Sequence, residues 1–175
     1  GAPTAGKLAD AVGEMIRGSV GSTVRLQVER SSTGRIENIE LRRGIVPQPS
    51  IPDYYIIRDN VGYIDLSEGF NYTTNAEFTK ALQELHRSGM RSLIIDLRGN
   101  GGGIVDQAIK VAEKFLPAGS LILSERGRTS ADSREWRSNN PTPETLPLVV
   151  LVDENTASAS EIVAGALQDS DRALI

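Results

Sequence analysis

Two short segments of the sequence carry residues that could perform acyl-transfer chemistry. The first is Asp-Glu-Asn-Thr-Ala-Ser-Ala-Ser-Glu at 153–161, which follows an apolar run at 148–152 and precedes a helical pattern. Its middle serine, Ser158, falls in the first turn of the predicted helix, where backbone N–H groups have no partner within the helix. The N–H of Ala159 could therefore face a negatively charged oxygen, helped by the positive end of the helix dipole.

The same segment has a simpler interpretation as a helix cap. Serine and threonine are among the residues that most often cap helix N-termini, and Thr156, Ser158 and Ser160 are all placed to do so. The residue types alone therefore leave two possibilities open, a nucleophile and a cap.

The second segment is a glycine cluster, Asp-Leu-Arg-Gly-Asn-Gly-Gly-Gly at 96–103, which overlaps the end of an apolar strand pattern at 92–97. Glycines in this position let the backbone approach a ligand and adopt positive φ. A dinucleotide-binding fingerprint is excluded, because Ile104 stands where its last glycine would be, and there is no Gly-Lys-Ser/Thr for a nucleotide-binding loop. An oxyanion-binding loop and a tight strand-to-helix turn both remain open, and Arg98 and Asn100 are expected to brace the loop rather than to react.

A serine hydroxyl becomes a good nucleophile only when a base takes its proton. The only histidine, His86, lies at the end of a predicted helix, where a cap or surface role fits better than a catalytic one. The only lysines are Lys7, Lys80, Lys110 and Lys114, and the last three fall on predicted helices with side chains that are most simply solvated. The sequence thus offers a nucleophile candidate without an evident base.

The elements that position these segments follow from hydrophobic periodicity. Residues 1–46 predict a helix and two alternating strands, too little to enclose an independent core, and the prolines of 47–52 predict a stiff linker. From 53 onward strands alternate with helices, which predicts an α/β layered domain with largely parallel pairing. The expected strands are 54–57, 61–66, 92–97, 121–123, 148–152 and the start of one at 173–175; the expected helices cover 78–85, 105–116 and 162–167, with a Thr74–Glu77 capping box before the first and a polar loop at 127–147.

Composition narrows the function classes. The 175 residues carry a net charge of −4, which argues against binding a nucleic-acid backbone. The absence of cysteine and the single histidine argue against a structural zinc site. No apolar run approaches the roughly 20 residues that span a bilayer.

Taken together, the two segments give the sequence a resemblance to the C-terminal processing proteases (tail-specific proteases), serine peptidases with a Ser–Lys dyad and a PDZ domain. The resemblance rests on the glycine cluster and on Thr-Ala-Ser-Ala-Ser-Glu followed by Ile-Val-Ala-Gly-Ala-Leu-Gln-Asp. It implies that Ser158 is the nucleophile and that the N–H groups of Ala159 and Gly103, with Gly102 as the next candidate, form the oxyanion hole. It also implies that Asp169 supports the site.

The resemblance further implies a crotonase-like layered αβ protease core over 53–175, preceded at 1–46 by the second half of a PDZ domain. The lysine of the family would fall about 25 residues after the nucleophile, near position 183, so the chain is expected to be a fragment that is inactive or nearly so. The implied substrates are proteins or peptides with apolar C-termini, and no metal or organic cofactor is implied. The implied location is extracytoplasmic, in the bacterial periplasm or cell envelope; the oligomeric state stays open.

Two alternatives belong to other classes. The chain could be a catalytically silent, PDZ-containing peptide-binding module. It could also be a crotonase-like acyl-CoA enzyme, because oxyanion holes are shared between such enzymes and hydrolases, but the PDZ-like half and the serine segment count against this.

Overall fold

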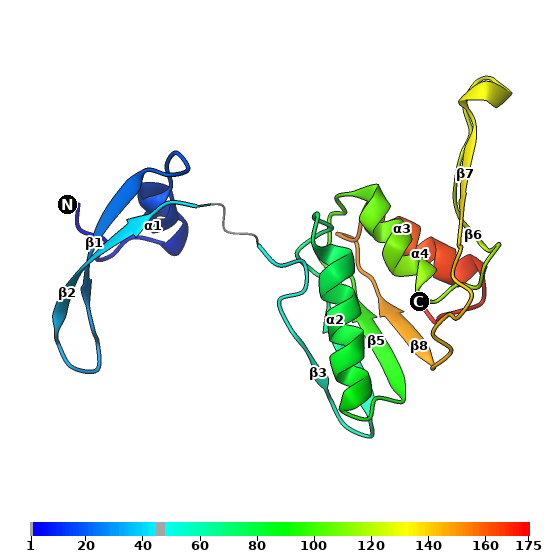
Figure 1. Ribbon diagram of the computed structural model, residues 1–175, viewed down its shortest axis with the longest axis horizontal. Coiled ribbons are helices and arrows are strands. Elements are labelled where there is room, and N and C mark those ends of the chain that lie inside the picture. Colours follow the sequence, from blue (N-terminus) through cyan, green and yellow to red (C-terminus); the bar gives the residue numbers. More distant parts are fainter. Residues whose placement is uncertain (1, 45–47) are drawn as a thin grey trace. The chain divides into compact units, whose positions relative to one another are not determined.

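The computed structural model describes residues 2–44 and 48–175. The chain forms two compact units, residues 1–47 and 48–175, and each is described by itself (Figure 1). Within the described residues, no helix is both long enough and apolar enough to cross a membrane.

The first unit consists of one helix and one hairpin. Helix α1 (Ala9–Ile16) is followed by strands β1 (Thr23–Glu29) and β2 (Ile36–Arg42), which pair antiparallel. Arg43 joins the helix to the hairpin, because its guanidinium donates to the carbonyl oxygens of Ile16 at 2.7 Å and of the first β1 residue at 3.1 Å. None of the side chains described in this unit is fully buried.

The second unit contains a four-stranded sheet in the order β3-β4-β5-β8. Strands β4 (Val61–Asp65), β5 (Ser92–Asp96) and β8 (Leu148–Leu151) run parallel, and β3 (Tyr54–Ile56) pairs antiparallel with β4 at one edge. The alternation of strands and helices in the sequence therefore predicted the mainly parallel pairing correctly.

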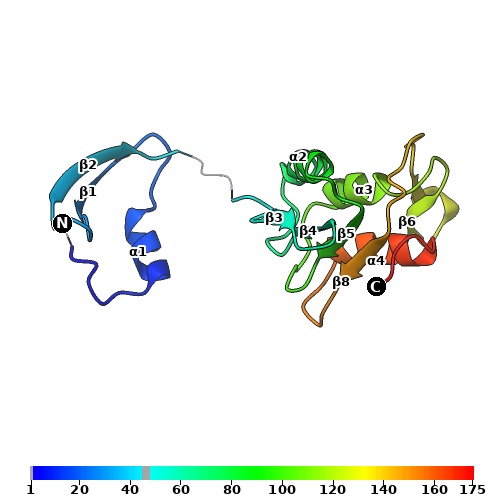
Figure 2. The same ribbon diagram turned by 90° about the horizontal axis from the view of Figure 1, so that it is seen from below.

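This unit also contains three α-helices: α2 (Thr74–Arg87), α3 (Val105–Glu113) and α4 (Ala159–Asp169). Figure 2 shows α2 and α3 on the same side of the sheet, and α4 packs against α3. Beneath them the rings of Phe78 and Phe115 meet edge to face, with centroids 6.0 Å apart, and both rings are fully buried. Each parallel strand ends at the same edge of the sheet, so the segments that follow β5 and β8 meet there.

The second unit departs from expectation at residues 127–147, where a polar loop was predicted. Strand β7 (Arg134–Arg137) pairs antiparallel with β6 (Leu121–Glu125), and the short 3-10 helix η1 (Ser130–Asp132) lies between them. The hairpin they form is the yellow arm of Figure 1. The prediction was wrong because β7 is mostly exposed on both faces, so its residues carry no alternating apolar pattern.

The start of this unit also differs from the predicted linker and capping box. Ser50 and Ile51 are buried, and the hydroxyl groups of Ser50 and Thr74 lie 2.6 Å apart. The N-cap of α2 is Thr73 rather than Thr74, and the Glu77 carboxylate accepts the N–H of Ile51 at 3.0 Å. Residues 48–52 therefore pack onto the second unit, while Pro47 lies outside the described residues.

The predicted strand at 173–175 is present as a single bridge. Leu174 pairs in parallel with Val149, and its carbonyl oxygen accepts the N–H of Val150 at 2.8 Å.

Candidate active site

Ser158 lies at the N-terminus of α4 in a backbone conformation that is unusual for serine. Its φ is 55° and its ψ is −117°, a region that residues other than glycine rarely occupy and that stores strain. The carboxylate of Glu161 accepts the N–H of Ser158 at 2.6 Å, and the two residues form a capping box. Ser158 is exposed, whereas Ala159 beside it is fully buried. A strained and exposed serine held in this way suits a nucleophile better than an ordinary cap.

The glycine segment after β5 lies directly against Ser158. Gly102 has φ of +98°, and a Cβ atom added there would lie 2.7 Å from the Cβ of Ser158 and 2.9 Å from the nitrogen of Ala159. Only a residue without a side chain permits such an approach. The structure thus brings together the two segments that the sequence marked as candidates.

The backbone N–H groups next to Ser158 are not equivalent. The N–H of Gly102 donates to Oδ1 of Asn100 at 2.8 Å, so this N–H already has a partner and Gly103 is the better placed of the two glycine candidates. Within the described residues, the N–H groups of Ala159 and Gly103 have no hydrogen-bond partner. Gly103 is held by Phe70 through bonds on either side: Phe70 donates its N–H to the oxygen of Gly102 and accepts the N–H of Ile104, both at 2.8 Å.

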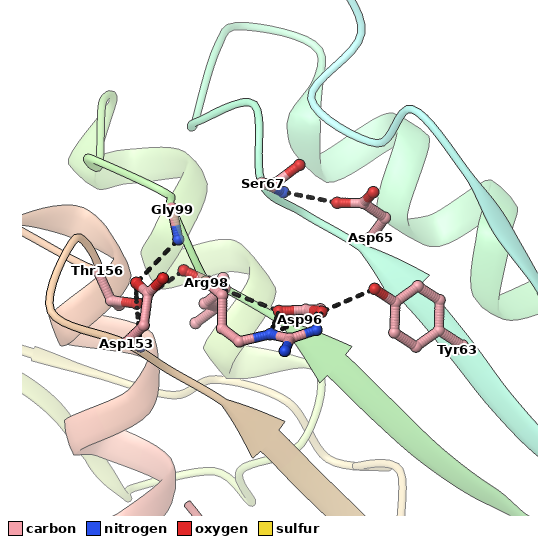
Figure 3. Close-up of polar contacts among 9 residues, drawn as sticks. Tyr63, Asp65, Ser67, Asp96, Arg98, Gly99, Asp153 and Thr156 are labelled. Atoms are coloured by element: carbon pink, nitrogen blue, oxygen red, sulfur yellow. Dashed lines mark hydrogen bonds and ion pairs between the residues drawn. The ribbon is translucent and has the colours of Figure 1, made fainter.

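A second connection between the two segments passes through Asp153. Its Oδ1 accepts the N–H of Gly99 at 2.9 Å and that of Asn155 at 3.0 Å, as Figure 3 shows for Gly99. The Gly99 bond above all holds the pKa of the Asp153 carboxyl below its ordinary value. Thr156 adds a third bond by donating to the carbonyl oxygen of Leu97 at 2.8 Å. The sequence analysis gave Asp153 no role and considered Thr156 only as a helix cap, although aspartate is a residue whose side chain often accepts the N–H two positions later in an Asx turn.

An ion pair between the buried Asp96 and the exposed Arg98 lies at the end of β5. Asp96 accepts the hydroxyl of Tyr63 at 2.7 Å and the Nη2 of Arg98 at 2.6 Å (Figure 3). Arg98 lowers the pKa of Asp96, whose side chain is only 6% exposed. Burial and the bond to Asp96 raise the pKa of Tyr63 to about 12. Arg98 therefore braces the strand end and has no contact with Ser158 among those described.

The structure does not bring Asp169 close to Ser158. Asp169 is the last residue of α4 and is exposed, and no described residue bonds to its side chain. Eleven residues separate it from Ser158, which amounts to ~16 Å along a helix. Within the described part of the chain, Asp169 has the position of a solvated helix C-terminus.

The second unit also holds no lysine or histidine bonded to Ser158 among its described residues. Nε2 of His86 lies 3.0 Å from a carboxylate oxygen of Glu144. Lys114 donates to the hydroxyl of Thr79 at 2.7 Å, and burial lowers its pKa, but it lies at the C-terminal end of α3. The glycine segment leads into the opposite end of that helix, ~15 Å away.

A mixed αβ unit that packs a strained, exposed serine against a glycine segment has an arrangement suited to acyl-transfer chemistry at a serine. Comparison with known proteins gives the class more exactly. The family model "Peptidase family S41" matches residues 60–175, and the chain belongs to this family.

Several relatives are C-terminal processing proteases. The chain is 34% identical over 157 residues to the carboxy-terminal processing protease CtpA of Bacillus subtilis, covering 89% of this chain and 33% of the relative. It is 32% identical over 179 residues to the chloroplastic carboxyl-terminal-processing peptidase 1 of Arabidopsis thaliana, covering 100% of this chain and 36% of the relative. The chain thus spans about a third of the length of these relatives.

Solved structures agree with the fold. The photosystem II D1 C-terminal processing protease superposes with a TM-score of 0.62 at 29% identity, covering 94% of this chain and 46% of that one. The putative S41 protease of Bacteroides fragilis superposes with a TM-score of 0.58 at 22% identity, covering 85% and 46%, and this likeness shows the fold alone.

Proposed function

We propose that this protein is a serine endopeptidase that cleaves proteins near their C-termini, with Ser158 as the nucleophile. The observation that carries the proposal is the contact between Gly102 and the Ser158–Ala159 turn, which leaves no room for a side chain. That contact supports a role for the glycine segment beside the carbonyl oxygen that attack by Ser158 would make anionic.

The reaction follows from this arrangement. Oγ of Ser158 attacks the scissile carbonyl carbon, and the carbonyl oxygen becomes an anion that accepts the N–H groups of Ala159 and Gly103. Collapse of this intermediate expels the amine and leaves an acyl ester on Ser158, which water then hydrolyses. Removal of one such donor typically costs a factor of about 10²–10³ in rate.

The proposed base is a lysine outside residues 1–175, near position 183 by resemblance. It would take the proton of Ser158 and later give it to the leaving amine. A lysine performs this role when desolvation lowers its pKa. Asp169 is proposed to support the site through residues that follow α4, because it lies at the end of that helix.

The domain assignment is part of the proposal. Residues 1–46 would be the second half of a PDZ domain. Their helix, their hairpin and the absence of a fully buried side chain among those described fit half of a domain. Residues 53–175 would be a crotonase-like protease core. The PDZ portion would capture substrates with apolar C-termini by strand addition, and the protein would act outside the cytoplasm, in the bacterial periplasm or cell envelope.

The test uses the full-length protein and an unfolded protein substrate with an apolar C-terminus. Cleavage by the wild type is compared with that of Ser158→Ala and of Ser88→Ala, an exposed serine at the end of α2. Cleavage that is lost only in Ser158→Ala supports the proposal, and equal cleavage in all three removes Ser158 as the nucleophile. No cleavage in any of them would favour the silent peptide-binding module.

A further inference from the structure

Asn100 bonds to three separate parts of the second unit, to two of them through its buried side chain and to the third through its backbone carbonyl oxygen. Its exposed fraction is 0%. Its Oδ1 accepts the N–H of Gly102 at 2.8 Å, and its Nδ2 donates to the carbonyl oxygen of Leu66, just after β4. Its own carbonyl oxygen accepts the N–H of Ala157 at 3.0 Å and the hydroxyl of Ser160 at 3.1 Å. Asn100 therefore connects the sheet, the glycine segment and the serine turn.

We infer that Asn100 is a positioning residue that sets the two oxyanion-binding N–H groups relative to each other. The inference deepens the proposed function and rests on it. Its first support is the bond to Gly102, which turns the peptide before Gly102 toward the core. Of Gly102 and Gly103, only Gly103 then has an N–H without a partner among the described residues.

The second support is the bonding of the Asn100 carbonyl oxygen to residues on both sides of the nucleophile. Ala157 precedes Ser158, and Ser160 follows Ala159, so this one oxygen anchors the turn that carries the other oxyanion donor. Asn100 is thus bonded both to the glycine segment that carries Gly103 and to the turn that carries Ala159. Preorganised donors of this kind need no rearrangement when charge develops on the substrate.

The amide group of Asn100 is suited to this role because it both donates and accepts. Oδ1 accepts the N–H of Gly102, and Nδ2 donates to the carbonyl oxygen of Leu66. If the amide were flipped, a donor would face the Gly102 N–H and an acceptor would face the Leu66 carbonyl oxygen. In a fully buried position either mismatch is costly, which fixes a single orientation. Aspartate has the same size but, when ionised, offers no donor to Leu66.

The test measures kcat, KM and the affinity for a peptide aldehyde in full-length protein. A bound aldehyde forms a tetrahedral adduct with serine, so its affinity reports on the oxyanion donors. For Asn100→Asp and Asn100→Ala we expect kcat to fall about 10- to 100-fold, with aldehyde affinity falling by the same factor. KM should stay within about threefold, because ground-state binding is not the target.

Ser138→Ala is the matched control. Ser138 is 2% exposed and also bridges backbone groups, since its hydroxyl donates to Leu116 at 2.6 Å and accepts from Asn140 at 3.1 Å. It lies beyond the far end of α3, so Ser138→Ala should lower the melting temperature and leave kcat and aldehyde affinity unchanged.

Three results separate the positioning role of Asn100 from the proposed function. If Ser158→Ala abolishes cleavage but Asn100→Asp folds with unchanged kcat and aldehyde affinity, the positioning role is wrong and the proposed function stands. An Asn100→Asp protein that does not fold would also overturn the inference, because Asn100 would then serve stability alone. If Ser158→Ala cleaves like the wild type, the proposed function itself fails.

Discussion

Gly102 and Ser158 are packed so closely that a Cβ atom on Gly102 would lie 2.7 Å from the Cβ of Ser158. The same added atom would lie 2.8 Å from the carbonyl oxygen of Ala157, so the whole turn before α4 rests on the glycine backbone. The chemistry proposed at Ser158 would therefore depend on a residue that contributes neither a side chain nor a free N–H.

Gly102→Ala is expected to displace this turn. The φ of Gly102 is +98°, so a side chain there adds backbone strain to the steric conflict. We expect kcat/KM to fall by about 10²-fold or more. The free energy of unfolding should fall by ~1–3 kcal/mol. Gly101→Ala is the control, because a Cβ there meets nothing within 4 Å, and it should change stability by no more than about 0.5 kcal/mol. Equal losses in the two variants would contradict the packing argument.

Glu161→Ala is expected to destabilise the N-terminus of α4, where Ser158 lies. The variant loses the bond from the N–H of Ser158 at 2.6 Å and should lower the free energy of unfolding by ~1 kcal/mol, the usual value of a helix cap. Glu161→Gln keeps an acceptor and should lose less. Urea denaturation measures the free energies of unfolding. Glu154→Ala, at an exposed position, serves as the control. If Glu161→Ala is as stable as Glu161→Gln, the bond contributes nothing.

Asp96→Asn is expected to remove a pH-dependent part of the stability. The folded pKa of Asp96 is lowered, chiefly by Arg98. Its stabilising contribution is therefore present above the ordinary aspartate pKa of about 3.9 and is lost as the pH falls through the lower folded value. Near neutral pH the variant should be less stable by ~1–3 kcal/mol. The difference between wild type and variant should shrink in acid, and a constant difference from neutral pH to acid would exclude this linkage.

Tyr63 is expected to titrate later than an ordinary tyrosine. Its pKa of about 12 follows first from burial and then from its bond to Asp96. The folded pKa of Tyr63 exceeds the unfolded value of about 10. The stabilising contribution of Tyr63 to the folded state is therefore fully present below about pH 10 and is lost as the pH rises through the folded pKa. Spectrophotometric titration should show a late tyrosine that is missing in Tyr63→Phe. The assignment fails if the native protein has all its tyrosines titrating near the ordinary pKa.

The amino-acid sequence alone determined most of the secondary structure and both segments of the candidate site. Helices and parallel strands carry strong periodic patterns, so α2, β5 and α3 were predicted close to their observed positions. The segments around Ser158 and Gly103 were recognisable because residue types at strand ends and helix starts are constrained by backbone chemistry. The family assignment, which the comparison with known proteins confirmed, followed from the same residues.

The tertiary structure decided what each group is bonded to. That Gly102 has no free N–H depends on the orientation of the buried Asn100 amide, and that Glu77 binds Ile51 depends on a chain segment 26 residues away. Strand β7 has no apolar alternation because pairing with β6, rather than burial, makes it a strand. Hydrogen bonds between distant segments leave no periodic trace in a sequence, since they depend on which elements pack side by side rather than on local pattern.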